Sequence, residues 1–317
     1  MPDLHVVVTM DVEVPTSQSH GSASGPPDAE SGGQWSKAFA NVAGSFGLPV
    51  TYFVHPEVVL EQGSLYKHLE DAGHCLGLHL HAWRFDARYR CEFGGLNERQ
   101  ARQMLSEAND IWRTVFGARP LYFRPGTMSA NDAIFRVLSD LGFRGGSLSL
   151  PGRVFPDKHA VWMGAPLDPH RAHPDFRLVE GPLDFANMPV SVDTSKLIAK
   201  GGRHFHYDLR PDFTDIDHVA IVRRIVGQIV ERDPLVPCIN LLTHNDHDFS
   251  DQASTVTCNL LATLKAIERA SAEYGLSCRG STLADICDAV VAHPPKESTF
   301  DPSGGRVIFD EDDRPRG

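Results

Sequence analysis

The sequence predicts an α/β fold in which a parallel sheet is flanked by helices. Apolar runs alternate with amphipathic stretches almost throughout the 317 residues, which is the pattern of buried strands and their covering helices. A chain of this length also suits one large α/β barrel, which commonly needs about 250 residues plus insertions. We therefore expect a single domain over residues 1–293.

The N-terminal part of the chain begins with a strand, a loop and a helix. Residues 4–10 form an apolar run that is typical of a buried strand. Residues 15–34 are rich in Ser, Gly and Pro and have no hydrophobic period, so we expect a mobile loop insertion there. Large apolar residues spaced three or four apart predict a helix over 35–46, and a strand follows at 50–54.

The clearest helix of the chain covers residues 97–116, where apolar side chains form a stripe between Asn97 and Gly117, which suit its two ends. Residues 150–215 show no sustained period, so we expect long irregular connections there. The polar residues 294–317 predict a disordered tail. The other expected elements are helices at 64–72, 130–141, about 216–231 and 252–274, a last helix capped by Thr282, and strands that lead into His79, Arg124 and Thr243.

Net charge and cysteine pattern narrow the classes of function. The formal charge of −11 supplies no basic face for phosphates, so we expect no nucleic-acid partner. There is neither a basic segment before a long apolar stretch at the start nor a run of about 20 apolar residues, which favours a cytoplasmic protein without a membrane partner. The six cysteines contain no CxxC pair, which favours reduced thiols over a disulfide framework.

Polar side chains with catalytic potential follow the predicted strands. In parallel α/β folds the loops after the strands converge, and active sites assemble at that edge. One polar residue at such a position commonly has a structural role, but several of them at one edge point to a site. The residues that share this placement are Asp11, Glu13, His79, His81, Arg124 and His244.

His79 and His81 are two residues apart at the end of an apolar run, where strand geometry points both rings the same way. With a carboxylate from the first strand they would give three protein ligands and an open position, the arrangement of a hydrolytic zinc site. A second carboxylate could then act as general base. Asp11 and Glu13 offer one group for each task, and their spacing does not decide which does which.

Arg124 fits as a fixed positive charge that keeps the base ionised, with a helix-capping or surface-pairing arginine as the alternative. His244 could protonate a leaving amine, and Asp246 or Asp248 could stabilise its charged form. The segment 244–248 is also compatible with a polar loop or a second metal cluster.

Taken together, these motifs resemble the polysaccharide deacetylase superfamily, the NodB homology domain of carbohydrate esterase family 4. The resemblance implies a distorted, incomplete (β/α) barrel and hydrolysis of an amide bond, typically in an N-acetyl group, with a divalent metal held by Asp-His-His. The segments that carry it lie in the family's order between about residues 4 and 290, at 4–13, 47–54, 72–79, 123–126, 142–144, 242–244 and 281–286.

The resemblance also implies roles for individual residues. By position in the motifs, Asp11 takes the place of the catalytic aspartate, His244 that of the catalytic acid, and Arg124 that of the matching arginine. For the fourth motif the nearest candidate is Asp193.

Two positions depart from the family pattern. The family's metal-binding aspartate directly follows the catalytic one, where this chain has Val12, and its second metal-binding histidine lies four residues after the first, where this chain has Trp83. Glu13 and His81 are the plausible substitutes, because a spacing of two keeps a carboxylate and an imidazole on the same faces. We therefore expect a variant metal site of Glu13, His79 and His81.

The expected function is hydrolysis of a carbon-nitrogen bond other than a peptide bond, with metal-dependent deacetylation of a soluble N-acetylated sugar or related small amide as the leading reaction. Zinc is the expected metal, with cobalt, nickel and manganese as alternatives, and a homo-oligomer is compatible with the sequence. A metal-independent hydrolase of cyclic amides, in which His81 and Glu13 bind substrate, and a catalytically inactive carbohydrate-binding relative are the alternatives. The residues expected to contact substrate are Trp83, Pro125, Gly126 and Asp246.

Overall fold

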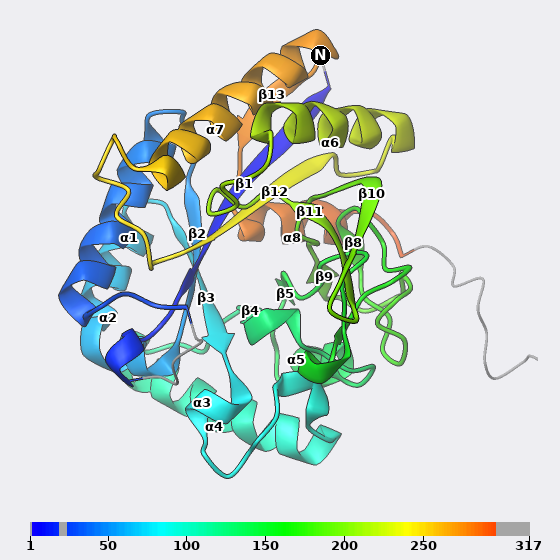
Figure 1. Cartoon of the computed structure of the whole chain (residues 1–317). Coiled ribbons are helices and arrows are strands. Elements are labelled where there is room, and N and C mark those ends of the chain that lie inside the picture. Colours follow the sequence, from blue (N-terminus) through cyan, green and yellow to red (C-terminus); the bar gives the residue numbers. More distant parts are fainter. Residues whose placement is uncertain (1, 19–23, 296–317) are drawn as a thin grey trace, which may run out of the picture.

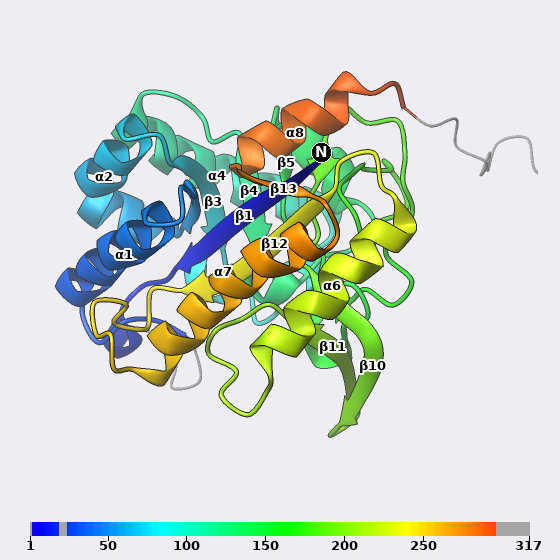
Figure 2. The same ribbon diagram turned by 90° about the horizontal axis from the view of Figure 1, so that it is seen from above.

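The computed structural model describes residues 2–18 and 24–295, and its centre is a curved, mostly parallel sheet (Figure 1). Helices cover the outer side of this sheet, which curls without closing (Figures 1 and 2). The expected fold class, a distorted and incomplete (β/α) barrel, is confirmed.

The long strands of the sheet are buried on both faces and bring their carboxyl ends to one edge. In this register Asp11 lies opposite His244, and His79 lies opposite Arg124. The order across the sheet is β12 (Cys238–His244), β1 (Asp3–Val12), β2 (Val50–Val54), β3 (Cys75–Leu80), β4 (Tyr122–Pro125), β5 (Gly145–Gly146), β9 (Ala186–Asn187) and β8 (His170–Arg171), with β13 (Ser277–Gly280) also paired to β1.

Most connections between the long strands contain a helix, as the alternating pattern predicts. The helix expected over 97–116 is confirmed: Asn97 and Gln100 form a capping box, and Gly117 ends the helix with φ of 74°. The helices are α1 (Ala29–Gly44), α2 (Pro56–Asp71), the single turn α3 (Ala82–Phe85), α4 (Glu98–Phe116), α5 (Ile134–Asp140), α6 (His218–Arg232), α7 (Thr255–Glu273) and α8 (Leu283–Ala292).

The loop predicted over 15–34 is wrong in its last part, because α1 begins at Ala29. Asp28 caps this helix by accepting a hydrogen bond from the backbone N–H of Ser31 at 2.7 Å. Gly32, one of the glycines that suggested a loop, serves packing within α1, since a Cβ there would collide with neighbouring side chains. Residues 19–23, in the middle of the loop that was expected to be mobile, lie outside the described part of the chain.

The prediction of irregular structure over 150–215 is also wrong in part. This segment supplies β8 and β9 and a second, antiparallel sheet. The strands of the second sheet are short or partly exposed and therefore lack the apolar runs that mark a buried strand. Their order is β10 (Val192–Lys200), β11 (Arg203–Asp208), β6 (Val154–Phe155) and β7 (Ala160–Val161).

Three further expectations concern the cysteines, the membrane and the C-terminal tail. All six cysteines are free thiols. Within residues 2–18 and 24–295, none of the helices has the length and apolar character needed to cross a membrane. The tail expected over 294–317 lies almost wholly outside the described residues, which end at 295.

Candidate metal centre and active site

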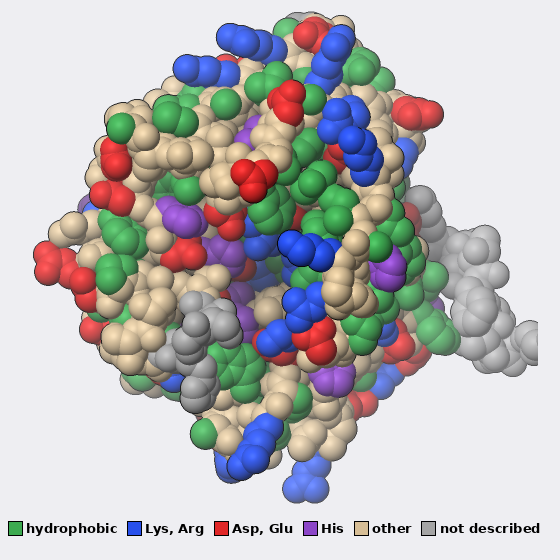
Figure 3. Space-filling model, viewed as in Figure 1, with side chains coloured by type: hydrophobic (Ala, Val, Ile, Leu, Met, Phe, Trp, Pro, Cys, Tyr) green, Lys and Arg blue, Asp and Glu red, His purple; other side chains and the backbone are tan. Residues whose placement is uncertain are grey.

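A cavity of about 600 Å³ opens at the carboxyl edge of the central strands. Figure 3 shows it as a hollow with histidine and acidic side chains on one side and lysine and arginine side chains on the other. The residues from strand ends that line it are Asp11, Glu13, His79, His81 and His244. The structure thus brings together side chains from three parts of the chain that are far apart in sequence.

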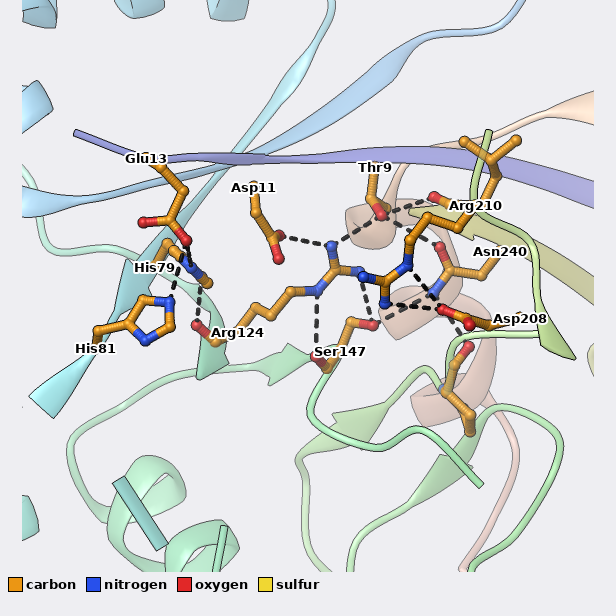
Figure 4. Close-up of polar contacts among 12 residues, drawn as sticks. Thr9, Asp11, Glu13, His79, His81, Arg124, Ser147, Asp208, Arg210 and Asn240 are labelled. Atoms are coloured by element: carbon orange, nitrogen blue, oxygen red, sulfur yellow. Dashed lines mark hydrogen bonds and ion pairs between the residues drawn. The ribbon is translucent and has the colours of Figure 1, made fainter. Parts of the chain in front are cut away.

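Glu13, His79 and His81 form a compact cluster at this cavity (Figure 4). Glu13 Oε1 lies 3.1 Å from His79 Nε2 and 3.0 Å from His81 Nε2. Ligand atoms around a tetrahedral zinc ion lie about 3.4 Å apart, a value that follows from zinc-ligand bonds near 2.1 Å. Both the spacing and the carboxylate-imidazole donor set therefore fit a divalent metal.

The other ring nitrogen of each histidine has an acceptor. His79 Nδ1 lies 3.0 Å from the backbone oxygen of Arg124, and His81 Nδ1 lies 3.2 Å from Glu92 Oε2. A neutral imidazole that donates from Nδ1 presents the lone pair of Nε2, and metal-binding histidines nearly always have such a partner. These contacts are a second observation in favour of a metal at this cluster.

The cluster is also strongly charged. Burial opposes the ionised form of Glu13, but the charges of His81 and His79 and their hydrogen bonds outweigh burial and hold its pKa well below the usual value. Burial likewise disfavours a charged His81 ring, yet Glu13 and Glu92 raise its pKa to about 10. In the absence of a metal ion, a proton on the imidazole therefore balances the carboxylate charge, and metal binding would release it.

Asp11 is paired with Arg124 beside this cluster. Arg124 NH1 donates to Asp11 Oδ1 at 2.8 Å and to Thr9 Oγ1 at 2.9 Å, and its NH2 donates to Ser147 Oγ at 2.9 Å. The guanidinium is fully buried and lies over the ring of Phe53, 4.1 Å from its centroid. This fixed arginine has the position that the sequence predicted for it, next to a carboxylate of β1.

Electrostatics keep Asp11 ionised. Burial raises the pKa of the carboxyl group, but the charges of Arg124, His79 and His244 and the hydrogen bond from Arg124 outweigh burial and lower it. A buried carboxylate that stays charged next to a metal cluster can accept a proton from water.

His244 ends β12 opposite Asp11 and lines the cavity, but the acidic partners predicted for it have other contacts. Asp246 lies 3.3 Å from His247 Nε2, and Asp248 accepts hydrogen bonds from Ser250. Neither contact joins these carboxylates to His244, so the expectation that one of them stabilises its charged form stays a prediction. Side chains in a turn after a strand point in different directions, and the sequence spacing does not encode them.

Asn245 has a role that the sequence did not indicate. Its Oδ1 accepts from the backbone N–H of Glu13 at 2.9 Å, and its Nδ2 donates to the backbone oxygen of Glu13 at 3.1 Å. The Asn245 N–H also donates to the backbone oxygen of Asp11 at 3.2 Å. The segment after β12 thus fixes the backbone at the end of β1, which carries Asp11 and Glu13.

The residues expected to contact substrate have different surroundings. Trp83 lines the cavity and donates from Nε1 to Glu92 Oε1 at 3.1 Å. Gly126 packs against the His81 ring so closely that a Cβ at this position would overlap it. Pro125, Gly126 and Asp246 are not among the residues that line the cavity, so substrate contact by them stays a prediction.

Several cavity residues were missed by sequence reasoning. Glu92 precedes a short 3-10 turn, η2 (Phe93–Gly95), and Arg153 and Arg210 belong to the segment interpreted as irregular. None of them follows a predicted strand, so the strand-end rule did not select them. Conversely, Asp193, the candidate for the fourth motif, pairs with Arg224 of α6 instead of facing the cavity.

Comparison with known proteins supports the resemblance that the motifs indicated. Residues 25–146 match the family model described as polysaccharide deacetylase. A putative polysaccharide deacetylase from Mycobacterium smegmatis matches over 95% of each chain, with a TM-score of 0.58 and 16% identity. The Puue allantoinase matches over 93% of this chain and 92% of its own, with a TM-score of 0.55 and 14% identity.

A probable polysaccharide deacetylase from Pseudomonas aeruginosa PAO1 matches over 93% of each chain, with a TM-score of 0.53 and 11% identity. Structural likeness at these identities shows the fold. No curated protein matches the sequence. The family match and the shared fold confirm the resemblance to the polysaccharide deacetylase superfamily.

Proposed function

We propose that this protein is a metal-dependent hydrolase that cleaves the amide bond of a soluble N-acetylated sugar or a related small amide. The deacetylase family match supports a hydrolase of the deacetylase type. One observation carries the finer proposal: a three-donor cluster and a separate, ionised carboxylate face the same cavity.

In this proposal Glu13, His79 and His81 hold the ion. Two imidazole nitrogens and one carboxylate oxygen suit zinc, and cobalt, nickel or manganese accept the same ligands. When bound, such an ion supplies polarisation of the amide carbonyl and a lower pKa for water.

The chain's own residues handle the protons. Arg124 contacts Oδ1 of Asp11, so we assign Oδ2 as the atom that accepts a proton from the attacking water. His244 lies across the β1–β12 pair from Asp11 and would give a proton to the leaving amine. Arg124 acts as a positioning residue, because its buried guanidinium keeps Asp11 charged and oriented.

One observation favours a second candidate, a metal-independent hydrolase of cyclic amides. The charged His81 ring already neutralises Glu13, so the cluster is stable as a set of hydrogen bonds. The Puue allantoinase, named for action on allantoin, shares this fold. In that case Glu13 and His81 would bind the substrate directly.

Metal analysis combined with turnover separates these candidates. We expect the purified protein to contain close to one equivalent of metal by elemental mass spectrometry, to lose turnover of N-acetyl sugars with a chelator, and to regain it with zinc. Glu13→Gln should lose both metal and turnover, whereas Asp11→Asn should keep the metal and lose turnover. A chelated protein that still opens cyclic amides would establish the second candidate. Binding of carbohydrate without hydrolysis of any amide would indicate an inactive relative.

A further inference from the structure

The wall of the cavity opposite the metal cluster is basic. The cationic side chains that line the cavity come from the second sheet and the segments next to it, and they are Arg153, Lys158, Arg203 and Arg210. Figure 3 shows lysine and arginine side chains on this side of the hollow and acidic and histidine side chains on the other. A molecule that fills the cavity therefore meets the metal cluster at one end and guanidinium groups at the other.

Three of these four cations already have carboxylate partners. Lys158 Nζ lies 3.8 Å from Glu92 Oε1, and Arg210 NH2 lies 2.8 Å from Asp208 Oδ2. Arg203 forms an ion pair with Asp157. These pairs leave little positive charge for a ligand.

Arg153 differs from the other three because no carboxylate in the described part of the chain pairs with it. Its NH1 donates to the backbone oxygen of Thr127 at 3.1 Å, and its Nε is buried without a hydrogen-bond partner among the described residues. The guanidinium lies 4.9 Å from the centroid of the Phe155 ring. Burying a polar N–H group without a partner costs free energy, which a ligand that accepts a hydrogen bond would recover.

The surroundings of Arg153 also favour an anion electrostatically. Burial and the like charges of Arg210 and Arg203 lower the pKa of Arg153 to about 10, and only Asp208 acts in the opposite direction. The guanidinium is still charged at neutral pH. A negative group in the cavity would therefore meet one uncompensated positive charge.

The position of Arg153 relates it to the catalytic end of the cavity. Thr127, its backbone partner, belongs to the turn η3 (Gly126–Met128), and the first residue of this turn packs against His81. Thr127 and Met128 hold positive φ angles of 54° and 56°, which is costly for residues with side chains. The turn η3 therefore links Arg153, which bonds to Thr127, with the proposed metal ligand His81, which packs against Gly126.

We propose that the amide substrate of this enzyme carries a carboxylate group, and that Arg153 binds this carboxylate while the amide lies at the metal cluster. This inference rests on the proposed function. One guanidinium fork matches one carboxylate, and the single uncompensated charge suits a monoanion better than a phosphate dianion. N-acetylated sugar acids and N-acetylated amino acids are the classes of compound that have both groups.

The test compares substrates that differ in this charge and in one methyl group. N-acetylmuramic acid and its methyl ester form one pair, and N-acetylglycine and its methyl ester form another. We expect kcat/KM for acetate release by the zinc-loaded protein to be at least about tenfold higher for the acid, because hydrogen bonds to charged groups are strong. In Arg153→Gln this ratio should fall to near one, and Arg153→Lys should restore part of it.

Two control variants show whether the loss of a different arginine also lowers the ratio of kcat/KM between acid and ester. Arg203→Gln removes a cavity arginine that is already paired with Asp157, and it should lower the ratio less than Arg153→Gln. Arg223→Gln removes an exposed arginine on α6 that is paired with Glu273, and it should leave both activity and ratio unchanged. Thermal melting confirms that each variant is folded.

The outcomes separate this inference from the proposed function. Equal kcat/KM for acetate release from the acids and from their methyl esters would overturn the inference and leave the proposed function intact. A higher kcat/KM for N-acetylglucosamine 6-phosphate than for the carboxylic acids would overturn the carboxylate assignment. If no amide is hydrolysed, calorimetry with N-acetylmuramic acid decides: binding that is lost in Arg153→Gln supports the anion site without the enzyme activity. Binding that is equal in both proteins, or absent in both, overturns it.

Discussion

At the scale of single residues, Glu92 connects Trp83, one of the two positions at which the chain departs from the family pattern, with His81, its proposed substitute. Its Oε2 lies against Nδ1 of His81, the substitute ligand, and its Oε1 accepts from Nε1 of Trp83, which stands where the family has a histidine. The Glu92 side chain is buried, so both contacts are shielded from water. The tryptophan therefore orients the carboxylate that orients His81.

Replacing Glu92 should weaken the proposed metal site without removing one of its three proposed ligands. In Glu92→Gln, we expect the affinity for zinc to fall about 10- to 100-fold, the usual cost of losing the carboxylate partner of a metal-binding histidine. Competition with a chromogenic chelator measures this affinity without any substrate. Trp83→Phe, which removes the indole N–H and keeps an aromatic ring, should have a smaller effect.

Glu107→Gln, on the exposed surface of α4, is the matched control and should bind zinc as the unmodified protein does. If Glu92→Gln also kept full affinity, the Glu92–His81 contact would have no part in holding the metal.

The residues that sequence reasoning found and those that it missed differ in one physical respect. Asp11, His79 and His244 follow apolar runs, and burial on both faces of a parallel sheet fixes where such strands end. Glu92 and Arg153 reach the cavity from connections whose path depends on tertiary packing. No local sequence pattern indicates that Glu92 contacts His81 or that Arg153 contacts Thr127.

At the scale of elements, the turn η3 after β4 determines where His81 can lie. The ring of His81 occupies the space that a side chain at Gly126 would need. This close approach is the reason why glycine is required at position 126.

Gly126→Ala should therefore displace His81, a proposed metal ligand. We expect zinc affinity to fall more than about 100-fold, beyond the loss typical of a histidine's hydrogen-bond partner, because His81 itself has to move. Gly44→Ala is the control, since a Cβ there meets nothing within 4 Å. Retention of zinc affinity in Gly126→Ala would mean that His81 is not a ligand, or that the turn yields at little cost.

The junction of β1 and β12 offers a second test at this scale. Asn245 bonds to both backbone groups of Glu13, and Asn245→Ala would leave these buried groups without their partner. We expect the free energy of unfolding to fall by about 1–3 kcal/mol, and zinc affinity to fall with it. Urea unfolding and chelator competition measure the two effects.

Asn259→Ala serves as a comparison for Asn245→Ala, because its side chain also bonds to backbone oxygens but lies on α7, outside the residues that line the cavity. It should lower stability without changing zinc affinity. An equal loss of affinity in both variants would show that the effect of Asn245 is a general loss of stability.

At the scale of the whole molecule, the fold was predictable and the second sheet was not. Buried parallel strands such as β1 and β12 have apolar runs that determine their place in the core. The strands β10 and β11 are partly exposed, so their pairing depends on tertiary contacts. This sheet and its flanking segments carry Arg153 and Arg210, and the basic side of the cavity was therefore invisible in the sequence.

The stability of the whole protein should depend on pH through His55, which is fully buried at the start of α2. Burial is the largest cause that lowers its pKa, and the charges of His79, His81 and Arg84 act in the same direction. Together they outweigh Glu13 and bring the pKa to about 3. The ring is thus neutral in the folded state and gains a proton near pH 6.5 in the unfolded state. Its contribution is complete above pH 6.5 and is lost progressively as the pH falls from 6.5 toward 3.

His55→Asn tests this expectation, because asparagine keeps an acceptor for the N-cap and does not titrate. As the pH falls from 6 to 4, the free energy of unfolding should decrease in both chelated proteins. The decrease should be steeper in the unmodified protein than in His55→Asn by about 1 kcal/mol per pH unit, because unfolding of the unmodified protein takes up one more proton. His68→Asn, on the exposed side of the same helix, should keep the steep slope. Equal slopes for all three proteins would mean that His55 is protonated in the folded state, and that Glu13 outweighs the cost of burying the charge.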